Sequence, residues 1–389
     1  MRDVHIIGVS QAPVTRDTSV RGRYLAASVV QQALADAGIE KDRVDALYVG
    51  NMTSGLLAGQ QQVGGLIADY AELRGVDAVT IEAACASGAA AARMAYLTIA
   101  GGMQDVVVVC GLERMTHVDR DTVTRALATA SDWELEGARG ESFMSLNAQL
   151  MRGYMDRYGA EARDFAPFSI NAHRNALTNP NALFQKSVDL EGYLESRIVI
   201  DPIRVYDSSP VCNGAAAFVL AAADVARRLH PGAPRVAVAG SGAATAPLAL
   251  QRRADILQLE AVEISTRKAF AEAGVTHRDV SFFELHDAFT VMAALSLESA
   301  GFADPGTGTR FGTEDRIGLC GDLPVSTMGG LKARGHPVGA TGVYQIVEAY
   351  LQLTGAAGEN QVRDAAVGLV QNIGGTGATV VSHVLRRVD

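Results

Sequence analysis

Cys85 is the residue of this sequence best placed to act as a nucleophile. It follows a strand-like stretch, residues 78–84 (AVTIEAA), and precedes a helix-like stretch, residues 89–102. At a helix start, unpaired N–H groups and the helix dipole stabilise a thiolate. The small neighbours in ACASG leave room for a substrate. The pattern predicts a nucleophilic cysteine, and the alternative is a small cysteine buried in the core.

Two histidines precede expected helices. His336 lies in Gly335-His336-Pro337, and proline favours the first helical position, so the helix dipole should keep this imidazole neutral and able to accept a proton. His286 lies in residues 283–289 (FELHDAF), at the carboxyl end of an expected strand, where open α/β sheets bind ligands. Asp287 is expected to orient a ring or to cap the next helix. Packing at the turn is the alternative role for His336.

A glycine-rich turn, residues 372–377 (NIGGTG), follows another expected strand. Its glycines allow backbone N–H groups to approach a substrate closely, as an oxyanion hole requires. The chain lacks a G-x-G-x-x-G or P-loop motif, a G-x-S-x-G elbow and an H-E-x-x-H motif, so nucleotide cradles and zinc hydrolysis are not supported.

An internal repeat predicts the elements that carry these residues. Residues 33–49 and 269–285 align without a gap, with Ala33 opposite Ala269 and Gly38 opposite Gly274. Each copy reads as an amphipathic helix with a glycine C-cap, then an apolar strand. Each follows a strand candidate, residues 4–10 or 235–241. The alternative is a chance likeness of two helix–strand units.

The sequence therefore predicts an α/β fold of two similar halves. The first comprises residues 1–118 and 207–235, and the second comprises residues 236–389. Residues 119–206 differ in composition and are expected to form an inserted, partly helical loop subdomain.

Composition and charge disfavour several classes of function. The net charge is −9 and no Lys/Arg run is present, which disfavours nucleic-acid binding. No apolar run approaches the ~20 residues of a membrane span, and the start does not read as a signal peptide. The four cysteines are widely spaced, so the sequence predicts no metal site and a cytoplasmic location. Cys110 and Cys212 are expected in the core, and Cys320 lies in a loop.

Together these residues resemble the thiolase superfamily over almost the whole chain. Its C-x-S, N-E-A-F, G-H-P and C-x-G blocks are similar to Cys85-Ala86-Ser87, His286-Asp287-Ala288-Phe289, Gly335-His336-Pro337 and Asn372-Ile373-Gly374. The H-D form is similar to sterol-carrier-protein-type thiolases and archaeal acetoacetyl-CoA thiolases. The resemblance implies a duplicated five-layer αβαβα fold with an inserted loop subdomain.

The resemblance also implies roles for residues. Cys85 would be acylated with His336 as base, and the N–H groups of Cys85 and Gly374 would form an oxyanion hole. Met115, Asn372 and Phe289 would lie in the substrate pocket. Candidate contacts for coenzyme A, chosen by position alone, are Arg139, Arg152, Lys186, Lys332 and Arg334.

Two departures from the family pattern concern the base that acts at the substrate α-carbon. Thiolases usually place a second thiol in C-x-G or in H-D-C-F, and here Asn372 and Ala288 occupy those positions. We expect His286 to remove the α-proton, because a neutral imidazole is a base suited to pH 7. His336 is the competitor.

The implied activity is acyl-CoA C-acyl transfer, in which a 3-ketoacyl-CoA such as acetoacetyl-CoA is made or cleaved. Coenzyme A thioesters would be substrates, and no cofactor is expected. The alternatives are decarboxylative Claisen or retro-aldol chemistry on CoA esters, and a non-catalytic scaffold or lipid carrier with the same fold. The resemblance further implies a homodimer or dimer of dimers paired through an edge strand at residues 106–110 (VVVVC), and a small OB-fold partner.

Overall fold

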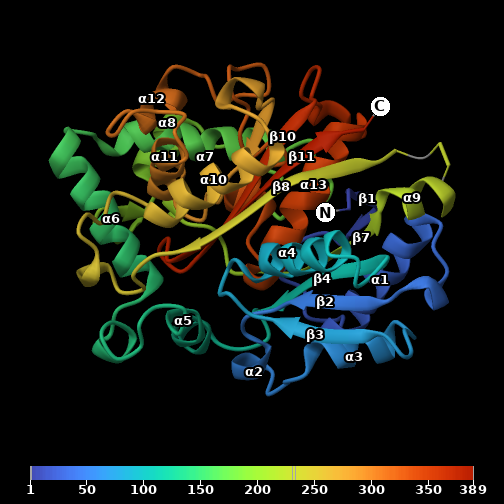
Figure 1. The fold of residues 1–389 in the computed structure, drawn as a ribbon. Coiled ribbons are helices and arrows are strands. Elements are labelled where there is room, and N and C mark those ends of the chain that lie inside the picture. The colour runs from blue at the N-terminus through green and yellow to red at the C-terminus, as the bar shows by residue number, and fades with distance from the viewer. Residues whose placement is uncertain (1, 230, 233, 389) are drawn as a thin grey trace.

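A nine-stranded mixed sheet runs through the computed structural model of the chain, which describes residues 2–229, 231, 232 and 234–388 (Figure 1). Its strands lie in the order β3-β2-β4-β7-β1-β8-β11-β10-β9. A separate two-stranded sheet pairs β5 with β6. The strand bounds are β1 (Val4–Gln11), β2 (Ala46–Gly50), β3 (Asp77–Ile81), β4 (Val106–Arg114), β5 (Ile198–Ile200), β6 (Ile203–Arg204), β7 (Asn213–Ala222), β8 (Val236–Thr245), β9 (Phe282–Glu284), β10 (Val367–Gly374) and β11 (Thr379–Arg387).

Helices connect and cover these strands. The α-helices are α1 (Gly22–Ala37), α2 (Ser54–Leu57), α3 (Val63–Tyr70), α4 (Ser87–Ala100), α5 (Arg120–Ala128), α6 (Phe143–Tyr158), α7 (Ala162–Ala176), α8 (Leu190–Glu195), α9 (Ala223–Leu229), α10 (Glu260–Ala273), α11 (Thr290–Ser299), α12 (Gly308–Thr313) and α13 (Thr341–Thr354). Short 3₁₀ turns are η1 (Lys41–Arg43), η2 (Gly137–Arg139), η3 (Val205–Asp207), η4 (Leu250–Arg252), η5 (His277–Asp279), η7 (Val338–Ala340) and η8 (Gly358–Asn360). One π-helical turn is η6 (Gly330–Arg334). Within the described residues, no helix is both long and apolar enough to cross a bilayer.

The sheet and helices form layers in two related halves. Helix α1 packs on β1, β7 and β4, and α10 packs on β8 and β11. Helices α4 and α13 contact each other and strands of both halves, so they form the central layer (Figure 1). This arrangement confirms the duplicated α/β fold.

The repeat is visible in how each half packs its first helix. A Cβ added to Gly8 in β1 would lie 2.7 Å from the Ala33 carbonyl oxygen of α1, and one added to Gly240 in β8 would lie 2.2 Å from that of Ala269 in α10. Each helix ends at its expected left-handed glycine, Gly38 with φ 62° or Gly274 with φ 63°. Only glycine permits so close a helix-to-strand approach.

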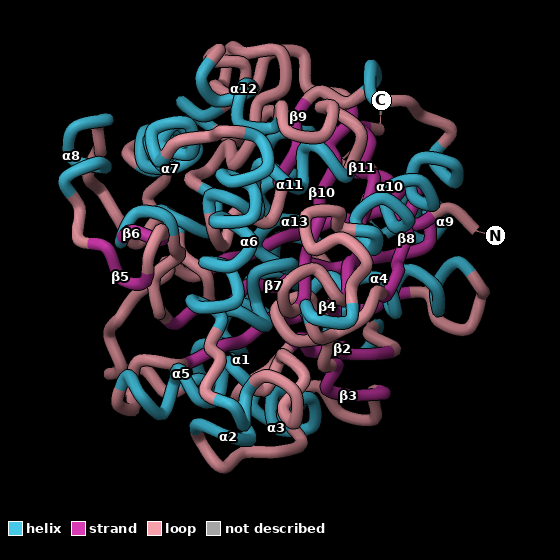
Figure 2. The backbone as a smooth tube through the Cα atoms, turned by 90° about the vertical axis from the view of Figure 1, so that its left-hand side faces the viewer, coloured by secondary structure: helices cyan, strands magenta, loops and turns pink. Residues whose placement is uncertain are grey.

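The middle of the chain packs on both halves. Helices α6 and α7 bury Met151, Tyr154 and Phe165 in one core with residues of α10 and α11. Their neighbours α8, β5 and β6 lie at the left edge of Figure 2. After them, β7 returns to the first half, where it pairs with β1 and β4.

The prediction that residues 106–110 form an edge strand is wrong. Residues 106–110 belong to β4, which lies between β2 and β7 and is fully buried there. The edge of this half is β3, where Val79 is 41% exposed. An unbroken apolar run is typical of an inner strand covered on both faces, which explains why residues 106–110 do not form an edge.

Candidate active site

Cys85, His286 and His336 converge at one place. One ligand atom of each lies within 4.8 Å of the others. The two imidazole centroids are 5.1 Å apart, with the rings nearly perpendicular. All three side chains are buried. They come from the starts of α4 and α13 and from the link between β9 and α11, so the fold joins residues from both halves.

A tight turn presents Cys85. Ala84 adopts a left-handed conformation with φ 52°. The Ser87 hydroxyl donates to the Ala84 carbonyl oxygen (2.6 Å) and accepts from the Ala83 N–H (2.9 Å). A non-glycine residue in this region is strained, and strain of this kind gathers at functional sites.

The helix starts behind Cys85 and His336 touch. A Cβ on Gly88 of α4 would lie 2.9 Å from the Val343 nitrogen of α13, and one on Gly342 would lie 2.4 Å from the Ala89 nitrogen. The positive ends of both helix dipoles therefore point toward the same centre, where they stabilise developing negative charge.

Burial raises the pKa of the Cys85 thiol to about 12, and the nearby Glu113 carboxylate raises it further. The backbone N–H groups of Cys85 itself and of Gly375 act in the opposite direction. Glu113 is itself buried, and it accepts N–H bonds from Met52 (3.0 Å) and Gly339 (3.1 Å). The thiol at rest is thus neutral, and it would need a base to react as a nucleophile.

His336 is oriented as that base. Its Nδ1 lies 2.7 Å from the Thr341 hydroxyl oxygen, and that hydroxyl donates to the Pro337 carbonyl oxygen (3.3 Å). Because the hydroxyl proton is used there, Nδ1–H donates to Thr341 and Nε2 keeps its lone pair. Burial, with smaller contributions from His286 and Arg334, keeps the pKa of His336 well below its usual value.

His286 is oriented in the opposite sense. The Asn372 amide nitrogen donates to His286 Nδ1 (3.0 Å), which places the His286 proton on Nε2. Burial, followed by Arg334, lowers its pKa to about 3. Our expectation that His286 is the α-carbon base is therefore not favoured, because this tautomer is a hydrogen-bond donor.

Two further expectations are corrected. Asn372 does not line the substrate cavity: it is fully buried and supports His286. Asp287 neither caps α11 nor orients a catalytic ring. Its Oδ1 accepts the Leu331 N–H (2.7 Å) and so holds the π-helical turn η6. These contacts join segments far apart in sequence, so local patterns did not indicate them.

A cavity of about 500 Å³ leads to the three residues. Met115 and Phe289 line it, as expected. Much of the remaining lining is apolar and comes from residues 116–147 and 197–211: Val118, Val123, Leu127, Phe143, Met144, Val199, Val205 and Val211. Such a lining suits an acyl chain and the arm of a thioester.

The cationic residues at this cavity differ from those expected. Arg334 is fully buried against Glu348 (2.9 Å), and Lys332 is buried with its ammonium donating to the Asp207 carbonyl oxygen (2.6 Å). Neither can reach a phosphate. Arg139, Arg152 and Lys186 are on the surface outside the cavity, where Arg152 pairs with Asp201. The arginines that line the cavity are Arg16, Arg120 and Arg197, which the sequence analysis missed because they come from three separate segments.

The glycine-rich turn lies where the sequence indicated. The amide that faces the Cys85 sulfur is that of Gly375, which also lines the cavity. Gly374, the residue implied by the resemblance, packs against the Ala83 carbonyl: a Cβ there would lie 2.4 Å from its oxygen. Among the cysteines, Cys110 and Cys212 are buried, whereas Cys320 is exposed away from the site.

Comparisons with family models and with curated relatives indicate the same family. Residues 4–224 match the thiolase N-terminal domain, and residues 242–387 match the thiolase C-terminal domain-like family. The acetyl-CoA acetyltransferase of Methanothermobacter thermautotrophicus is 42% identical over the full length of both chains. That of Methanocaldococcus jannaschii is 37% identical over 99% of each. A solved structure, the Ltp2–ChsH2(DUF35) aldolase, shares the fold with a TM-score of 0.87 over 99% of this chain and 98% of that one, at 22% identity.

Proposed function

The chain belongs to the thiolase family and is an acyltransferase, and from that premise we propose that it makes or cleaves a 3-ketoacyl-CoA such as acetoacetyl-CoA through an S-acyl-Cys85 intermediate. The observation that carries the proposal is the convergence of one thiol and two oppositely oriented imidazoles in a cavity of suitable size.

In the first step Cys85 Sγ attacks the carbonyl carbon of an acyl-CoA while its proton passes to His336 Nε2. We assign the developing oxyanion to the N–H groups of Cys85 and Gly375, which face the sulfur beside which it forms. When the intermediate collapses, the CoA thiolate leaves and takes the proton from His336. The products are S-acyl-Cys85 and free CoA, and His336 is again neutral.

In the second step neutral His336 removes a Cα proton from another acyl-CoA, and His286 Nε2–H holds the enolate oxygen. The carbanion attacks the acyl carbon on Cys85, and the thiolate that leaves recovers the proton from His336. One base thus serves both steps, which accounts for a site with Asn372 and Ala288 at the two usual thiol positions.

Acetylation and deuterium exchange test this assignment. Wild type incubated with acetyl-CoA should gain an acetyl group on Cys85, detected by peptide mass spectrometry, and Cys85→Ala should gain none. Exchange at Cα of acetyl-CoA in D₂O should be lost in His336→Ala and slowed at least tenfold in His286→Ala.

The matched control for exchange is Cys320→Ala, which removes an exposed thiol outside the cavity and should exchange as wild type does. If Cys320→Ala lost exchange while both histidine variants kept it, a thiol would be the base. Acetyl groups on Cys320 or Cys212 in place of Cys85 would refute the nucleophile.

Decarboxylative and retro-aldol chemistry on CoA esters are the competing activities. Both avoid the second thiol. The turn that presents Cys85 supports acyl transfer over retro-aldol cleavage, which needs no acylated cysteine. Consumption of malonyl-CoA, or cleavage of a 3-hydroxyacyl-CoA without acetylation of Cys85, would favour the competitors.

The proposal also includes the residues that bind coenzyme A and a partner protein. We assign the CoA phosphates to exposed Arg16, Arg120 and Arg197 around the cavity, since guanidinium groups suit phosphate. A small partner protein of OB-fold type is part of the proposal, and the structural neighbour, an aldolase that pairs Ltp2 with ChsH2(DUF35), supports it. Higher activity on addition of such a protein would test it.

A further inference from the structure

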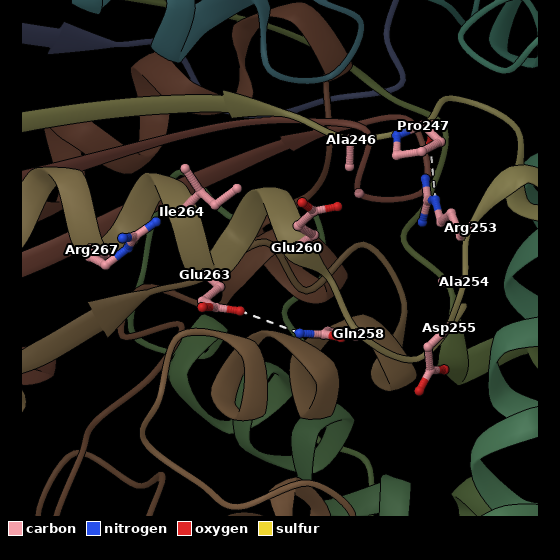
Figure 3. Close-up of a pocket in the computed structure, with 11 residues that line it drawn as sticks. Ala246, Pro247, Arg253, Ala254, Asp255, Gln258, Glu260, Glu263, Ile264 and Arg267 are labelled. Carbon is pink, nitrogen blue, oxygen red and sulfur yellow. Dashed lines mark hydrogen bonds between the residues drawn. The ribbon is translucent and has the colours of Figure 1, made fainter.

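A second pocket, of about 380 Å³, lies against the back of the catalytic glycine turn (Figure 3). It is lined by the loop after β8, by the first turns of α10 and by Gly377. The catalytic cavity is lined by Gly375. Residues 375–377 therefore separate the two spaces, with Thr376 buried between them.

Arg253 connects the second pocket to this turn. Its Nη1 donates to the Thr376 carbonyl oxygen (2.7 Å) and its Nη2 to the Thr376 hydroxyl oxygen (3.2 Å). Its Nε donates to the Pro247 carbonyl oxygen (3.0 Å), a bond drawn in Figure 3. One guanidinium thus ties the glycine turn to the loop after β8 by a planar set of donors that no other side chain offers.

The loop that supplies Arg253 is itself anchored. The buried Glu136 carboxylate accepts the Leu250 N–H (2.8 Å), and the Ala246 N–H donates to the Ala378 carbonyl oxygen (2.8 Å) just past the turn. The guanidinium is therefore held from several directions and is a fixed partner for Thr376.

The turn needs such a partner. Gly375 and Gly377 both have positive φ, 64° and 97°, and glycine has little intrinsic preference for one conformation. The Ala378 N–H bond to the Gly374 carbonyl oxygen (3.2 Å) closes the turn at its ends but leaves the peptide units between them unrestrained. Arg253 bonds to the residue between the two glycines.

We propose that Arg253 is a positioning residue that holds Thr376, and through it aims the Gly375 N–H at the Cys85 sulfur. The inference rests on the proposed S-acyl-Cys85 chemistry for its effect on turnover. Arg253 lies outside the catalytic cavity, so it acts on the turn and not on the substrate.

The test compares Arg253→Met with Arg267→Met in a Cys320→Ser background. Arg267 lines the same pocket but is exposed on α10, at the end of the pocket away from Arg253 (Figure 3). Removal of a fully formed oxyanion donor costs about 10²–10³ in kcat, and a misaimed donor should cost about tenfold or more. We expect that loss in kcat for Arg253→Met with KM unchanged, and no loss for Arg267→Met.

A second readout does not depend on acyl transfer. Alkylation of Cys85 by iodoacetamide should slow at least threefold in Arg253→Met, because the Gly375 N–H then no longer stabilises the thiolate. Added guanidinium ion should restore part of both rates. Arg253→Lys, with one ammonium in place of a fork, should fall between wild type and Arg253→Met.

The outcomes separate the two proposals. Absence of acetylation on wild-type Cys85 would refute the proposed function, while a slowed alkylation would still uphold the role of Arg253. Wild-type alkylation and kcat in Arg253→Met would overturn the inference. If Arg253→Met failed to fold, Arg253→Lys would decide: a loss of kcat with KM unchanged supports the coupling, and wild-type kinetics refute it.

Discussion

At the scale of single residues, the site is defined by neutral groups in a buried space. Burial raises the pKa of Cys85 and lowers those of His286 and His336. A thiolate–imidazolium pair is therefore disfavoured at rest, and the thiol gives up its proton only as it attacks. Two hydrogen bonds, one from His336 to Thr341 and one from Asn372 to His286, then decide which imidazole accepts and which donates.

This protonation state predicts the pH dependence of Cys85 reactivity. In a Cys320→Ser background, the rate of alkylation by iodoacetamide should rise about tenfold per pH unit from pH 6 to 9 without a plateau, because a thiol whose pKa is raised to about 12 is still almost fully protonated there. Cys85→Ala gives the background rate. A plateau between pH 5 and 8 would instead indicate a resting ion pair.

The reactive residues could be predicted from sequence, but their supporting contacts could not. Cys85, His286 and His336 lie in short motifs whose spacing places each beside a helix start. Asn372 supports His286 from 86 positions away, and Arg334 turns inward because Glu348, on the next helix, is buried beside it. Such pairings follow from the packed fold and leave no local pattern.

At the scale of elements, three segments bring arginines to the cavity. Arg16 follows β1, Arg120 begins α5 and Arg197 immediately precedes β5. The last two belong to the chain between β4 and β7, which also supplies much of the apolar lining. In the proposed function, this middle segment therefore holds the thioester, while the two halves hold Cys85, His286 and His336.

Substitution of Arg197 tests this division of roles. Arg197→Gln should raise KM for acetyl-CoA severalfold and leave kcat near wild type, because it weakens phosphate binding without touching Cys85. The effect should shrink at high ionic strength. Arg152→Gln is the matched control: Arg152 pairs with Asp201 outside the cavity and should leave KM unchanged. Equal KM values for both variants would contradict the assignment.

At the scale of the whole molecule, one sheet edge stands out. Strand β3 ends the first half of the sheet, and its residues are exposed or half-buried. Exposed Met94 and Leu97 lie on α4, which contacts β3. An open edge of this kind can pair with another chain, so we propose that the dimer expected from the sequence would form through β3 and not through β4.

Val79→Arg tests that interface. A charge in the middle of β3 should convert a dimer into a monomer in sedimentation at micromolar concentration, because two arginines would meet across the two-fold axis. Val20→Arg, at an exposed valine away from the sheet, should sediment as wild type. A wild-type protein that is already monomeric at this concentration would exclude the interface.

Much of the fold could be predicted because the spacing of apolar residues along the chain indicates the helices and strands. The helix faces of α1 and α10, the caps at Gly38 and Gly274 and the strands before them all appear where the repeat indicated. The order of strands in the sheet could not be predicted, because it depends on which apolar strand is covered on both sides. That is why the sequence predicts the strand at residues 78–84 but places residues 106–110, and not this strand, at the edge of the sheet.

The contact between α4 and α13 bears on how the two halves of the chain evolved. The two helices occupy matching places in the two halves, and Cys85 precedes one as His336 precedes the other. In a symmetric pair of identical single-half chains, both places would carry the same amino acid, either two thiols or two imidazoles. With the two copies fused into one chain, one place carries a thiol and the other an imidazole. Duplication within one chain thus allowed the two halves to carry different residues at matching positions.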